Sequence, residues 1–137
     1  MVNVFSGEIF VTNVAIAGEW IAGVGKEYVD GKEVLDLSGL YLLPGLINGH
    51  LHLESSLLAP VEYARLALAH GTTTVILDPL DIANVLGLPG IQALIDSSKD
   101  LPLDFFFMAP SCVPTTPLET AGGFIPSTDV EKLLKNK

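Results

Sequence analysis

The chain has 137 residues, of which 49% are hydrophobic, and its mean hydropathy of +0.49 is typical of strands buried on both faces. Sixteen acidic and seven basic residues give a formal net charge of −9, which argues against nucleic acid as a partner. No apolar run approaches the ~18 residues of a membrane span, no basic segment precedes an apolar one at the N-terminus, and a single cysteine, Cys112, excludes an internal disulfide. We therefore expect a cytoplasmic protein with no membrane partner.

Residues 1–43 are expected to form an antiparallel sheet. Short apolar or β-branched runs alternate here with turns that contain glycine, and strands so close in sequence pair as hairpins. We expect this sheet to be part of a small β-sandwich domain, in which Trp20 packs against its neighbours. The predicted strands cover residues 2–5, 8–16, 20–24, 33–37 and 40–43.

A histidine pair lies near the end of the next predicted strand, at 46–51, which follows a Leu-Pro-Gly turn at 43–45. Side chains repeat with period two along a strand, so His50 and His52 should point to the same face. Two neighbouring imidazoles can bind one divalent metal ion through their ring nitrogens. Two histidines this close also occur by chance, but the carboxyl end of a strand is where β/α barrels place their chemistry.

The rest of the chain alternates between helices and strands. Pro60 fits the first turn of a helix that Gly71 ends, and Gly87 and Pro89 interrupt a second helix. A run of β-branched residues between the two helices predicts a buried strand. The predicted order is helix, strand, broken helix, strand and helix, over residues 60–71, 72–77, 81–98, 103–108 and from a cap at 128 or 129 onward.

Strands that alternate with helices predict a parallel sheet with right-handed crossovers. Residues 44–137 would then supply about three of the eight βα units of a TIM-type (β/α) barrel, which needs ~250 residues in total. The predicted fold class is therefore α/β, with the start of a barrel after the partial sandwich of residues 1–43. Such a barrel cannot close by itself, so we expect oligomers or association with the missing barrel portion.

Four polar residues follow strand ends and are candidates for the site. Glu54, after the histidine pair, and Asp78, after the second strand, are candidate catalytic carboxylates, with a loop carboxylate and a helix cap as the alternatives. Ser111 and Cys112 follow the third strand and could line a substrate pocket, although a buried thiol is often inert. His70 is expected to cap the C-terminal end of its helix.

Five stretches are similar to bacterial and archaeal adenine deaminases, which belong to the amidohydrolase superfamily. The first contains the histidine pair and resembles the metal-binding opening of that superfamily. Residues 3–8 add to the likeness, which extends over nearly the whole chain. The stretches are 43–52 (LPGLINGHLH), 52–56 (HLESS), 70–75 (HGTTTV), 78–87 (DPLDIANVLG) and 108–114 (MAPSCVP).

The resemblance implies a hydrolase of purine metabolism that converts adenine to hypoxanthine and ammonia. It also implies one or two divalent ions, Mn, Fe or Zn, that activate water, with His50 and His52 among their ligands. A carboxylate would carry the proton to the leaving nitrogen. Members of the family are several times longer, so the chain resembles an N-terminal portion that we expect to be inactive alone.

Three positions depart from the family pattern, which usually has Asp in place of Asn48 and His-Glu in place of Leu80 and Asp81. Leu80 cannot bind a metal ion, whereas Asp81 keeps a carboxylate. These departures leave open a non-catalytic protein of the same descent, or a subunit that needs a partner chain to complete the barrel. Another cyclic-amide hydrolase could share the opening motif, but the stretches at 54–56 and 78–79 argue against it.

Overall fold

The computed structural model describes residues 1–135, and the chain divides into two compact units, Met1–Pro44 and Gly45–Lys137. Among the residues that the structure describes, no helix is both long and apolar enough to cross a membrane. Each unit has its own sheet.

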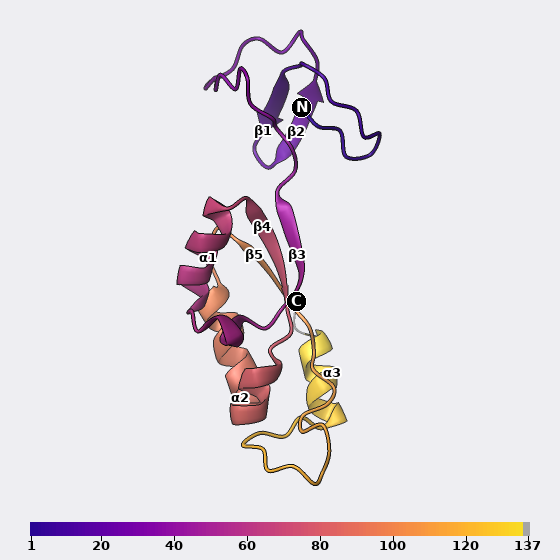
Figure 1. The fold of residues 1–137 in the computed structure, drawn as a ribbon, viewed down its shortest axis with the longest axis vertical. Helices are drawn as coiled ribbons and strands as arrows, with labels where there is room; N and C mark the ends of the chain where they lie inside the picture. The colour runs from indigo at the N-terminus through magenta and orange to yellow at the C-terminus, as the bar shows by residue number, and fades with distance from the viewer. Residues whose placement is uncertain (136–137) are drawn as a thin grey trace. The chain divides into compact units, whose positions relative to one another are not determined.

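The first unit contains one antiparallel hairpin, formed by β1 (Val14–Ala17) and β2 (Trp20–Val24) (Figure 1). Gly18 makes its turn with a φ of +61°, a conformation that glycine adopts without strain. A single bridge between Val2 and Ile9 is the other strand-like pairing in this unit. The antiparallel sheet is thus confirmed, but it is smaller than predicted.

The strands predicted at 2–5, 33–37 and 40–43 are wrong, and in place of the strand predicted at 8–16 the structure has only β1, at Val14–Ala17. The apolar residues of these runs are mostly exposed, and Trp20, which we expected to pack, has 78% of its surface exposed. Strand propensity mainly reflects how side chains pack on a half-buried sheet. These segments have no buried face, so their apolar and β-branched residues alone did not make them form strands.

The second unit contains a three-stranded parallel sheet with the order β3-β4-β5 (Figure 1). The central strand β4 is fully buried at Val75 and Leu77, so it forms the base of a core that also includes buried residues of α1. The predicted parallel sheet is confirmed. Its strands are β3 (Leu46–Leu51), β4 (Thr72–Leu77) and β5 (Asp104–Phe107).

Helices connect the strands as predicted. The helix after β3 begins with Pro60 and is capped at its C-terminal end by His70, followed by Gly71 with a φ of +85°, as expected. The last helix begins at Ser127, so the prediction of a cap at residue 128 or 129 is wrong. The helical elements are the 3-10 helix η1 (Leu53–Ser56), α1 (Pro60–Ala69), α2 (Leu80–Ser98) and α3 (Ser127–Lys135).

A second core joins α2 to the loop after β5 and to α3. Ala83 and Ile91 of α2 are fully buried against Val113 and Ile125 of that loop, and Val130 of α3 packs on the same cluster. The loop is therefore held on α2 although it has no regular structure of its own.

α2 bends at Gly87, as the sequence predicts. This residue has a φ of 63° and a ψ of −148°, a backbone conformation that is almost exclusive to glycine. Next to the bend, the carbonyl of Asn84 accepts hydrogen bonds from the N–H groups of Gly122 and Gly123, at 2.8 and 2.9 Å. The loop after β5 thus takes over hydrogen bonds that a straight helix would make internally.

Replacing Gly87 by alanine is expected to destabilise the second unit by about 1–3 kcal/mol, because an L-residue is strained in this conformation. A Cβ atom at this position would make only ordinary contacts, of which the nearest is 3.6 Å from the carbonyl oxygen of Phe124, so the expected loss comes from the backbone conformation. Gly49→Ala is a matched control, since its Cβ would meet no atom within 4 Å and its φ is not positive. Urea melts of both variants measure the difference, and equal stabilities would contradict the expectation.

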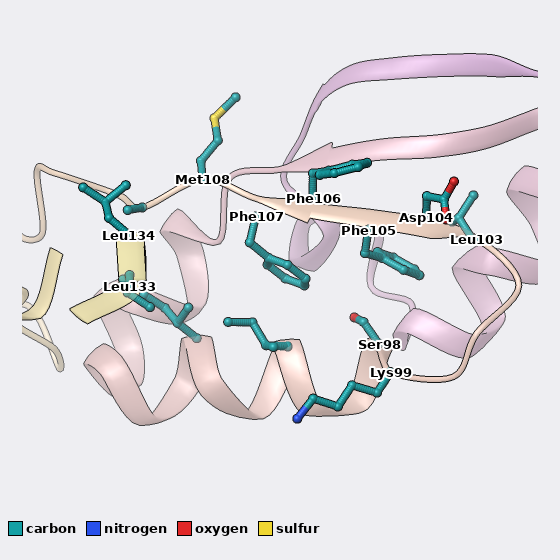
Figure 2. A pocket seen from close by; sticks show the side chains of 13 residues that line it. Ser98, Lys99, Leu103, Asp104, Phe105, Phe106, Phe107, Met108, Leu133 and Leu134 are labelled. Atoms are coloured by element: carbon teal, nitrogen blue, oxygen red, sulfur yellow. The ribbon is translucent and has the colours of Figure 1, made fainter. Parts of the chain in front are cut away.

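The outer strand β5 borders an open groove of about 710 Å³ that is also lined by α2 and α3. Figure 2 shows Phe105 and Phe107 pointing toward α2, whereas Phe106 points to the opposite side of the strand. Phe106 has 60% of its surface exposed, while Phe105 and Phe107 pack against the core. Within residues 1–135, one face of the sheet is thus covered, whereas Phe106 on the other face is exposed and β5 pairs on one side only.

Candidate metal centre

The two histidines lie side by side at the carboxyl end of β3. His50 is in the strand and is exposed, and His52 lies one residue beyond it and is half-buried. Their ring centroids are 5.0 Å apart, with the ring planes tilted by 57°. The spacing of two residues therefore brings both imidazoles together, although the strand itself ends at Leu51.

Asp78, directly after β4, lies beside both histidines. Its backbone N–H donates to the carbonyl of Leu51 at 2.9 Å, which joins the ends of the two strands. One of its carboxylate oxygens, Oδ2, lies 3.7 Å from Nε2 of His50. The three side chains each offer one ligand atom, and these atoms all lie within 4.8 Å of one another. The sequence indicated Asp78 as a candidate catalytic carboxylate, and its position beside the histidines makes it a candidate third metal ligand as well.

Two further contacts orient this group. Nδ1 of His52 lies 2.9 Å from the backbone carbonyl oxygen of Asp78. The side-chain oxygen of Asn48 accepts a hydrogen bond from the backbone N–H of His50, at 3.3 Å. Asp78 Oδ1 is buried and has no hydrogen-bond partner among the described residues. The group therefore contains a desolvated carboxylate oxygen that faces no protein donor.

Glu54 lies on η1, outside this group of three. Its Oε1 accepts a hydrogen bond from the backbone N–H of Ile82 at 3.0 Å, and its Oε2 is buried without a partner among the described residues. Next to it, the hydroxyl of Ser55 donates to a carboxylate oxygen of Asp81 at 2.9 Å. A catalytic role for Glu54 remains a prediction, whereas its contact with the first turn of α2 could not be read from the sequence.

The other candidates lie further along the chain. Ser111 and Cys112 are exposed in the loop after β5, at the same end of the parallel sheet as the histidines, and their role as pocket residues remains a prediction. Leu80, where the resemblance expects a histidine, packs against the core cluster of Ala83 and Ile91 and offers no ligand atom. Asp81 lies in the first turn of α2.

Known proteins resemble the chain along its whole length. Adenine deaminases from Thermosipho africanus, Dehalococcoides mccartyi and Syntrophobacter fumaroxidans are 50%, 56% and 47% identical to it, over 98%, 98% and 100% of the chain. The chain covers 24%, 24% and 23% of these relatives, so it spans about a quarter of their length. Residues 41–136 match the sequence model of the amidohydrolase family. That match includes the whole parallel sheet and all three members of the histidine and aspartate group, and the chain accordingly belongs to the amidohydrolase family.

Proposed function

We propose that the chain forms the N-terminal part of an adenine deaminase, which hydrolyses adenine to hypoxanthine and ammonia. One observation carries the proposal: a chain about half identical to adenine deaminases groups His50, His52 and Asp78 at the ends of two neighbouring strands. In parallel β/α folds, substrates bind at the carboxyl ends of the strands.

The donor atoms of the group fit a divalent metal ion. Two imidazole nitrogens and one carboxylate oxygen are the protein ligands of several open zinc sites, and the same set binds Fe or Mn. The buried and unpartnered Oδ1 of Asp78 also fits, because such an oxygen is costly unless a cation or a donor satisfies it. An ion bound there would act as a Lewis acid toward water.

His52 is oriented for metal binding by the backbone. The carbonyl oxygen of Asp78 can only accept a hydrogen bond, so the 2.9 Å contact requires the proton of a neutral His52 to be on Nδ1. That tautomer leaves the lone pair of Nε2 free for an ion. The Asp78 backbone thus orients one ligand while its side chain supplies another.

The proposed reaction also needs a purine pocket and a proton carrier. The Asp78 carboxylate, whose Oδ2 lies 3.7 Å from Nε2 of His50, would accept a proton from the attacking water and pass it to the leaving nitrogen. Ser111 and Cys112, exposed beyond the carboxyl end of β5, are proposed to line the pocket for adenine.

We further propose that β3, β4 and β5 begin a (β/α) barrel and that residues 1–43 contribute to a β-sandwich. The parallel order of the three strands and the connecting helices support a barrel, in which later strands would pair with the edge of β5. The chain spans about a quarter of its relatives, so the remaining strands and ligands would come from the rest of such a protein.

A chimera tests this function directly. Residues 1–137 would replace the matching segment of the Dehalococcoides mccartyi relative, to which they are 56% identical. We expect the chimera, loaded with Mn or Zn, to release ammonia from adenine, and the 137-residue chain alone to release almost none. Adenine turnover by the chain alone, or a folded, metal-loaded chimera that leaves adenine unchanged, would contradict the proposal.

A non-catalytic amidohydrolase is the second candidate, and the packing of Leu80 into the core favours it. The same chimera distinguishes the two functions if it is also made with Leu80→His and Asp81→Glu, which restore the pattern implied by the resemblance. Activity that appears only in the restored chimera would support a chain that has lost catalysis. Activity in both would support the deaminase.

A further inference from the structure

The metal group depends on two segments whose strands pair with an irregular register. The histidines lie at the end of β3, and Asp78 follows β4. The pairing of these strands shifts its register between Leu46 and Ile47, and it shifts again between Asn48 and the last pair, Leu51 with Leu77. The second shift coincides with the position of His50, so the strand ladder is not continuous through the site.

The first turn of α2 lacks a cap from its own segment. Pro79 occupies the N-cap position and makes no side-chain hydrogen bond. Glu54 of η1 instead accepts the N–H of Ile82, and its negative charge lies at the helix end that attracts anions. A residue that follows the histidines by sequence therefore caps the helix that follows Asp78.

We propose that Glu54 is a positioning residue, which clamps the η1 segment to the start of α2 and so fixes the distance between the histidines and Asp78. This inference rests on the proposed function, because a positioning role for Glu54 requires that the histidines and Asp78 bind a metal ion. The Leu51 to Asp78 backbone hydrogen bond lies on one side of the site and the Glu54 to Ile82 hydrogen bond on the other, and the contacts of His52 with the Asp78 carbonyl and of Ser55 with Asp81 join the same two segments.

The test uses the chimera that contains residues 1–137, with divalent-ion affinity measured by competition against a chelator. Glu54→Ala is expected to weaken the affinity for Zn about 10–100-fold, as loss of an orienting contact does elsewhere. Glu54→Gln should bind Zn within a few-fold of the unchanged chimera, because its amide oxygen can still accept the N–H of Ile82. Glu62→Ala is the matched control, since Glu62 is an exposed first-turn glutamate of α1 whose ion pair in the described part of the chain is with Arg65.

Activity separates positioning from catalysis. With excess Zn, Glu54→Ala should regain most of its kcat, because saturation with the ion compensates for a weakened site. A kcat that stays low with the ion fully bound would overturn the inference in favour of a catalytic Glu54. If Glu54→Ala lowered the melting temperature but left the ion affinity unchanged, the inference would also be overturned, because Glu54 would then only cap α2.

The outcomes also separate this inference from the proposed function. A chimera that binds Zn through a Glu54-dependent site but leaves adenine unchanged would refute the deaminase and keep the clamp. A chimera that deaminates adenine and binds Zn equally well with Glu54→Ala would refute only the clamp. No Zn binding by the unchanged chimera would refute both.

Discussion

His52→Ala in the chimera is expected to lose the bound divalent ion and to lower adenine deamination roughly 1,000-fold, which corresponds to ~4 kcal/mol of activation barrier. His52 is half-buried and is oriented by the Asp78 carbonyl, and its removal leaves the group with two of its three ligand atoms. The ion content after gel filtration and the rate of ammonia release measure the two effects.

His70→Ala is the matched control, because His70 is exposed at the end of α1 and lies outside the metal group. It should retain both the ion and the activity. Asp78→Asn keeps the size of the side chain but removes its charge. We expect it to lower the affinity for the ion, as His52→Ala does. If His52→Ala retains the ion with unchanged affinity, the metal assignment is wrong.

The isolated 137-residue chain is expected to associate or to remain partly unfolded. In the described residues β5 pairs only with β4, which leaves a row of backbone N–H and C=O groups at its other edge. On the uncovered face of the sheet, Ile47 has 67% of its surface exposed and Phe106 has 60%. Burial contributes ~25 cal/mol per Å², so exposing several hundred Å² forgoes a large part of the ~5–15 kcal/mol that stabilises a typical domain.

Light scattering over a dilution series and denaturant melts measure this association. Phe106→Lys should reduce it, whereas Leu66→Lys, at an exposed apolar position of α1, should have little effect. Addition of the remaining part of the Dehalococcoides mccartyi relative as a separate chain should compete with self-association. A monomer that persists on dilution and unfolds in one sharp transition would contradict the expectation.

Local sequence signals were sufficient for most of the second unit. Pro60 and Gly71 defined the two ends of α1 because each fixes or permits one backbone conformation that a helix end requires. The β-branched run of β4 was predicted with its observed bounds, and the break at Gly87 followed from a residue that alone tolerates that φ and ψ. The spacing of His50 and His52 likewise indicated their proximity, since it depends only on the strand period.

Tertiary structure decided what local patterns could not. The predicted strands at 33–37 and 40–43 did not form, because a strand is stabilised by what covers its face, and their apolar residues are mostly exposed. Asp78 lies beside the histidines because β3 and β4 pair in parallel, which places their carboxyl ends next to each other. Asp78 is 26 positions from His52 in the sequence. The contact of Glu54 with Ile82 depends on the same pairing and on where α2 begins. The sequence therefore indicated His50 and His52 as candidate ligands and Asp78 as a candidate carboxylate, and the pairing of β3 with β4 brought the three together.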